Sequence, residues 1–123
     1  MADMASESGW LNPTGEAFVS IAVVRGHAID CLIDTGFTGD LLLPFELAEE
    51  YLLPVTGEQA CRLAGGARLV AFTSLLEITW LGERRVVRVL LSEGPDQLVG
   101  IGLLRRTRLK IDYLANTVEI EKP

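Results

Sequence analysis

Short apolar and β-branched segments, separated by turns that often contain glycine, follow one another along most of this chain. This rhythm constrains the fold more than any other feature. The first two segments, 18–24 and 28–33, flank a turn at 25–27 that contains Gly26. Apolar runs of this length on either side of a short turn are typical of antiparallel hairpins. We therefore expect the chain to begin its ordered part with a β-hairpin.

Later segments repeat the arrangement. They are 61–63 with 68–72, 74–80 with 84–91, and 108–113 with 117–121. Helical signals are confined to 45–52, which follows Pro44, and to 101–106. Because strands and helices do not alternate, a parallel sheet covered by helices is not expected. The pattern predicts a mostly β fold, a closed antiparallel β-barrel with one or two short helices.

The chain of 123 residues is long enough for one compact domain. Residues 1–15 are rich in serine, glycine and acidic side chains, so we expect a loose, flexible N-terminal arm there and the folded domain over 16–123. Cys31 and Cys61 do not form a disulfide framework, and we expect both to be reduced and buried.

Charge and hydropathy exclude several partners. The formal net charge is −6, from 17 acidic against 11 basic residues, which argues against nucleic-acid binding. No apolar run approaches the roughly 18 residues of a membrane span, so we expect no membrane partner. The first residues lack the basic start and apolar stretch of a secretory signal, and a cytoplasmic location is therefore expected.

The strongest candidate for chemistry is Asp34, which Thr35 and Gly36 follow between two apolar segments. A carboxylate at the edge of a dry sheet needs hydrogen-bond donors, because its burial otherwise costs free energy. Gly36, lacking a Cβ, lets its N–H face the carboxylate, and the Thr35 hydroxyl can brace the loop. A simple Asp-Thr-Gly turn without chemistry is the other interpretation.

Other polar residues fit catalysis less well. We interpret Asp30 and Asp112 as strand residues facing solvent, and Asp40 as a turn acid. His27 is the single histidine, so neither a catalytic triad nor a metal site is expected, and we expect no cofactor. The arginines at 84, 85, 88 and at 105, 106, 108 raise the question of an anionic ligand. We favour exposed strand faces and a helix end.

Residues 33–36 and their apolar flanks resemble the active-site loop of aspartic proteases. The likeness continues through 37–44, much as in small retropepsin-like proteases of bacteria, and it spans 17–120 in all.

Two further segments support this resemblance. Leu98, Val99 and Gly100, followed by 101–104, are similar to the loop and helix that cross under the active site in that family. Residues 61–72, tipped by a pair of glycines, occupy the place of its flap.

The resemblance implies a specific mechanism. Aspartic proteases use two carboxylates that share a proton around one water, and one of them acts as the general base. A chain with one Asp-Thr-Gly supplies the pair only as a homodimer, with each Asp34 facing its copy. A polypeptide is the implied substrate. The residues implied to contact it are Phe37, Thr38, Gly65, Gly66, Leu98, Val99 and Gly100.

The chain also departs from the family pattern. Retroviral members carry an aspartate and an arginine that pair between the two loops, and here those places hold Thr38 and Ile101. Losing both charges together is coherent, since one unpaired buried charge would be costly. Three functions therefore remain open: a homodimeric aspartic endopeptidase, a non-catalytic peptide- or protein-binding module with the same fold, and a β-barrel interaction protein unrelated to proteases.

Overall fold

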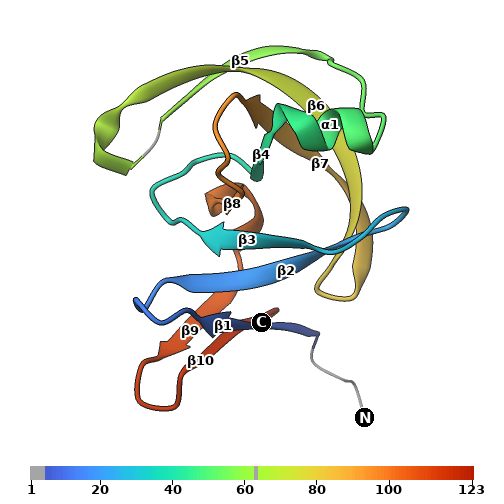
Figure 1. Cartoon of the computed structure of the whole chain (residues 1–123). Coiled ribbons are helices and arrows are strands. Elements are labelled where there is room, and N and C mark those ends of the chain that lie inside the picture. The colour runs from blue at the N-terminus through green and yellow to red at the C-terminus, as the bar shows by residue number, and fades with distance from the viewer. Residues whose placement is uncertain (1–4, 63) are drawn as a thin grey trace.

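The computed structural model describes residues 5–62 and 64–123 (Figure 1). Its strands are β1 (Ser6–Leu11), β2 (Ala17–Val23), β3 (Ile29–Ile33), β4 (Leu41–Pro44), β5 (Gly57–Arg62), β6 (Arg68–Trp80), β7 (Glu83–Ser92), β8 (Leu98–Val99), β9 (Arg108–Asp112) and β10 (Thr117–Glu121). Two short helices, α1 (Phe45–Glu50) and α2 (Ile101–Leu104), and a 3₁₀ turn at Ala64–Gly66 complete the described part. Neither helix has the length and hydropathy that a membrane crossing requires.

The sheet closes on itself. β2 pairs with β3 along one side and, at Ala22 and Val23, with β6 along the other. The ring consists of β2, β6, β7, β4, β8 and β3. The predicted mostly β, closed barrel with short helices is thus confirmed.

Two strand pairs of the ring depart from the predicted antiparallel pairing. β3 pairs with β8 in parallel, and β4 pairs with β7 in parallel. The strands of each parallel pair come from distant parts of the chain, whereas turn residues predict only the pairing of strands that follow one another. The parallel pairs bring the loop after β3 beside the loop after β8.

The larger of the two hydrophobic clusters fills the barrel. In β2, Val19 and Ile21 are fully buried and alternate with partly exposed neighbours, as a strand with one face inward requires. Cys31 of β3 is also fully buried, as predicted, and its thiol is free. Burial raises the pKa of Cys31 to about 12, with a smaller contribution from the charge of Asp30. The Cys61 side chain lies outside the described part of the structure.

The predicted loose arm is wrong over Ser6–Leu11, which form β1. This strand pairs with β10 along its length and with the start of β2 (Figure 1). Gly9 permits the close approach, because a Cβ there would overlap the carbonyl oxygen of Phe18. The Glu7 carboxylate accepts a hydrogen bond from the backbone N–H of Leu81 at 2.8 Å. Because most residues of β1 are polar or small, its sequence lacks the apolar alternation from which a strand is predicted.

A long hairpin of β5 and β6 arches over one end of the barrel (Figure 1). Arg62 pairs with Arg68 beside its tip, where the sequence predicts a hairpin. Gly65 and Gly66 are exposed and lie in the left-handed region, at φ values of 85° and 84°, which favours glycine. The two segments predicted on either side of Thr73 are one continuous strand, β6.

Candidate active site

Asp34 follows β3 directly and is half-buried. Its backbone N–H donates to the carbonyl oxygen of Val99 in β8 at 2.9 Å. The parallel ladder before it pairs Leu32 with Leu98 and Ile33 with Val99. Asp34 is therefore fixed at the point where two core strands end together.

The turn after Asp34 has the conformation that the sequence predicts. The N–H of Gly36 donates to Oδ1 of Asp34 at 2.9 Å, and the N–H of Phe37 donates to the Asp34 carbonyl oxygen at 3.1 Å. The Thr35 side chain is exposed, and its hydroxyl has no hydrogen-bond partner among residues 5–62 and 64–123. The predicted brace from Thr35 is thus missing in the single chain.

Backbone hydrogen bonds tie the loop after Asp34 to the start of α2. Ile101 N–H donates to the carbonyl oxygen of Phe37 at 2.8 Å, and Gly102 N–H donates to that of Gly39 at 3.0 Å. Gly100 N–H donates to the Asp40 carbonyl oxygen at 3.0 Å. The two loops therefore form one unit held by main-chain groups.

Two glycines make this contact between the loops possible. A Cβ at Gly100 would overlap the carbonyl oxygens of Gly39 and Phe37, and one at Gly102 would overlap the Asp40 carboxylate. The Asp40 carboxylate accepts from the backbone N–H of Arg88 in β7 at 3.1 Å, so it ties its loop to a distant strand.

Several predicted substrate contacts are core residues instead. Phe37 and Val99 are fully buried, Leu98 is 7% exposed, and Gly100 is buried. The Phe37 ring packs in the second hydrophobic cluster, which also contains Leu42, Ala71, Leu90 and Leu98. The side chains of Phe37, Leu98 and Val99 are thus covered in this conformation, and a ligand could meet these residues only through their backbone. The predicted contacts that remain exposed are Thr38, Gly65 and Gly66.

The structure adds apolar residues that the sequence analysis did not single out. Val70 and Phe72 of β6 are 69% and 43% exposed, and the Phe72 ring meets Phe45 edge to face at 5.5 Å. They line a cavity of about 430 Å³ together with the loop residues Glu93 and Asp96. The period-two spacing of Val70 and Phe72 is the signal that marks one face of the hairpin.

The other acidic candidates have structural roles. Asp30 accepts a hydrogen bond from the Ser20 hydroxyl on the exposed face of the β2–β3 hairpin. Asp112 caps the β9–β10 turn by accepting from the N–H groups of Leu114 and Ala115. No group of three metal-ligating side chains occurs in the described ranges.

Comparison with known proteins relates the chain to solved structures. No family model matches the chain, and no curated protein matches it. Among solved structures, the chain is similar to a retropepsin-like aspartic protease from Rickettsia conorii, with a TM-score of 0.70 and 18% sequence identity. The match covers 98% of this chain and 94% of that one. The chain therefore has the retropepsin-like fold over nearly its whole length, as the resemblance of its loops predicts.

Proposed function

We propose that the chain is an aspartic endopeptidase that works as a homodimer, with Asp34 of each protomer forming the catalytic pair. The observation that carries the proposal is the Asp34 carboxylate, anchored by the Gly36 N–H at the end of β3 in a retropepsin-like fold. Each chain holds one Asp-Thr-Gly, so a second carboxylate in the same position must come from a second copy.

The chemistry follows from two carboxylates placed close together. Repulsion prevents both from ionising, so the pair holds one proton. The ionised carboxylate takes a proton from a water between them, and the protonated one donates a hydrogen bond to the scissile carbonyl oxygen. The Gly36 N–H occupies one acceptor site of Oδ1, so Oδ2 and the second lone pair of Oδ1 remain for the water and the partner carboxylate. The water oxygen then bonds to the scissile carbonyl carbon and forms a tetrahedral intermediate. This intermediate collapses by breaking the C–N bond, as the carboxyl group that took the proton of the water passes it to the leaving amine.

The proposed substrate is an extended peptide with apolar side chains. The β5–β6 hairpin presents a glycine tip able to close over a bound segment. Exposed Val70 and Phe72 and the adjoining cavity of about 430 Å³ offer an apolar surface for alternate side chains. We therefore expect cleavage between apolar residues. The free, buried thiol of Cys31 fits a reducing compartment, and we propose a cytoplasmic location.

A non-catalytic binding module is the second candidate. It is favoured by Thr38 and Ile101, which replace the charged pair that retroviral relatives place between the loops. A chain that stays monomeric at micromolar concentration in analytical ultracentrifugation would favour the module, because a lone Asp34 cannot form a pair.

The decisive experiment compares cleavage of casein and of a peptide library by the wild type, Asp34→Asn and Asp30→Asn. Asp30 is the matched control, since it lies on β3, the strand that Asp34 follows, and is exposed. We expect Asp34→Asn to abolish cleavage and Asp30→Asn to retain it. Equal cleavage by wild type and Asp34→Asn would reject Asp34 as the catalyst.

A mixing experiment tests the pairing. When wild type and Asp34→Asn are mixed in equal amounts and allowed to exchange subunits, only dimers of two wild-type chains keep both carboxylates. Activity should then fall to about one quarter of that of wild type at the same total concentration. A fall to about one half would mean that each chain acts alone.

A further inference from the structure

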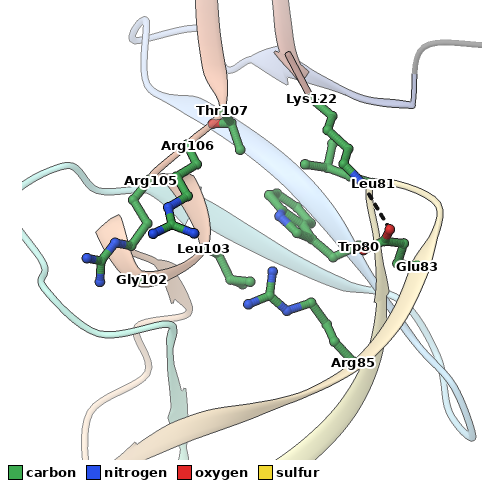
Figure 2. A pocket seen from close by; sticks show the side chains of 10 residues that line it. All are labelled: Trp80, Leu81, Glu83, Arg85, Gly102, Leu103, Arg105, Arg106, Thr107 and Lys122. Atoms are coloured by element: carbon green, nitrogen blue, oxygen red, sulfur yellow. Dashed lines mark hydrogen bonds and ion pairs between the residues drawn. The ribbon is translucent and has the colours of Figure 1, made fainter.

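A second cavity, of about 450 Å³, lies among the β6–β7 turn, α2 and the residues that follow α2 (Figure 2). Gly102 and Leu103 form part of its wall, and Gly102 also binds the loop after Asp34 through its N–H. The cavity therefore lies behind the active-site loop, and none of the predicted substrate contacts lines it.

The lining of this cavity is strongly basic in an acidic protein. Arg85, Arg105, Arg106 and Lys122 all line it, against Glu83 as the single acid, although the chain carries a net charge of −6. Lys122 pairs with Glu83 at 2.9 Å, and this hydrogen bond lowers the pKa of Glu83.

None of the three arginines forms an ion pair among residues 5–62 and 64–123, whereas Arg84 pairs with Glu77 at 3.3 Å. Arg85 lies near enough to Glu83 for its charge to add to the lowering of the pKa of that carboxylate. All three are exposed, as the interpretation of exposed strand faces and a helix end predicts.

A buried donor without a partner lies in the same place. Trp80 is 2% exposed and lines the cavity, and its Nε1 has no hydrogen-bond acceptor within the described residues. Buried polar groups in folded proteins nearly always have a partner, so an orphaned indole N–H calls for an acceptor. Figure 2 shows the Arg106 guanidinium to the left of the indole ring and the Arg85 guanidinium below it, while the Arg105 guanidinium points away. All three arginines are exposed and free to turn toward or away from the ring.

The backbone conformation of Arg106 is a further unusual feature of the cavity wall. Its φ of 63° is in the left-handed region, where glycine is the less strained residue. The chain nevertheless has an arginine there, directly after α2, with its side chain over the cavity (Figure 2). Strained residues of this kind gather at binding sites.

We propose that this cavity binds a small oxyanion, a molecule bearing a phosphate or carboxylate group. Arg85 and Arg106 clamp the anion, the N–H of Trp80 donates to one of its oxygens, and Arg105 contributes at the rim. A planar guanidinium matches two oxygens of either group at once, and the charge of the ligand neutralises unpaired arginines. The cavity volume falls in the range of small-molecule sites.

The test uses the intrinsic fluorescence of Trp80. Trp10, the other tryptophan, is replaced by phenylalanine, and inorganic phosphate or citrate is titrated while sodium chloride keeps the ionic strength constant. We expect a saturable change with at least one of the two anions. Saturation by phosphate alone identifies a phosphate site, and saturation by citrate alone identifies a carboxylate site. No saturable change with either anion overturns the proposal.

Variants locate the binding site. Arg85→Gln and Arg106→Gly should each weaken binding by about tenfold or more, because each removes a charged hydrogen-bond donor. Arg84→Gln is the matched control, since it removes the same charge from the neighbouring position, and it should change the affinity by less than about twofold. Equal weakening in all three, or none in Arg85→Gln and Arg106→Gly, would overturn the assignment.

The donor from Trp80 and the independence of the site are tested separately. Trp80→Phe keeps an aromatic side chain but removes the indole N–H, so calorimetry should show weaker binding by a folded variant. If this variant does not fold, the two arginine variants decide the question. Asp34→Asn should bind the anion as the wild type does, so the anion site and the proposed peptidase stand or fall independently.

Discussion

Replacing Phe37 with alanine separates the two roles that its position allows. As a lining residue of the substrate cleft, Phe37 would affect cleavage preference with little effect on stability. The structure instead places the ring in the core with no exposed surface, against Leu42, Leu90 and Leu98. We therefore expect Phe37→Ala to act first on folding.

The size of the expected loss of unfolding free energy follows from the area that the Phe37 side chain buries. A phenylalanine side chain buries on the order of 200 Å², which at about 25 cal/mol per Å² corresponds to about 5 kcal/mol. Alanine retains part of this contact and leaves a cavity, so the expected loss of unfolding free energy is about 3–5 kcal/mol. For a chain of this size the melting temperature should fall by roughly 10–20 °C. Because the ring packs against Gly39 and Gly100, cleavage should fall as well.

Urea denaturation followed by circular dichroism measures the change, with Phe72→Ala as the matched control. Phe72 is 43% exposed, so the same substitution should cost about half as much or less. A loss below about 1 kcal/mol for Phe37→Ala, combined with altered cleavage preference, would refute the core assignment.

Three more substitutions test other parts of the structure. Gly102→Ala should destabilise the fold by about 1–3 kcal/mol in urea denaturation and reduce cleavage, because the new Cβ would overlap the Asp40 carboxylate. Glu7→Ala should cost about 1–2 kcal/mol in the same assay, since the N–H of Leu81 loses a charged acceptor, and no loss would mean that β1 does not dock. In the wild type, the unfolded chain loses the Cys31 proton near pH 9 and the folded chain only near pH 12, so unfolding free energy should fall by about 1 kcal/mol per pH unit in that interval. Cys31→Ala should remove this slope in urea midpoints measured from pH 8 to pH 10.5, and an unchanged slope would contradict the burial of the thiol.

The sequence predicts those features of the fold that depend on interactions between residues close together in the chain. The alternation of Val19 and Ile21 marks β2, and Gly65 with Gly66 marks a hairpin tip, because these signals depend on the backbone and on near neighbours. The hydrogen bond from the Gly36 N–H to the Asp34 carboxylate is predictable for the same reason, since the two residues are only two positions apart.

Long-range contacts account for the rest. The parallel pairing of β3 with β8 joins segments far apart in the chain. The residue pattern of neither strand indicates which strand it pairs with. β1 lacks apolar alternation because it lies half-exposed between β10 and β2. The burial of Phe37 depends on Leu90 of β7, a neighbour that only the folded barrel supplies. The Arg85 and Arg106 pair is likewise assembled from separate elements.

The missing charged pair between the two loops has a structural replacement. At the positions where retroviral relatives pair an aspartate with an arginine, Thr38 is exposed and Ile101 is 38% exposed. The connection between the loops is made instead by main-chain hydrogen bonds, from Ile101 to Phe37 and from Gly102 to Gly39. Salt screens an exposed ion pair, whereas neutral backbone hydrogen bonds carry no such dependence. The connection between the loops, and with it the backbone around Asp34, therefore does not depend on the lost charges.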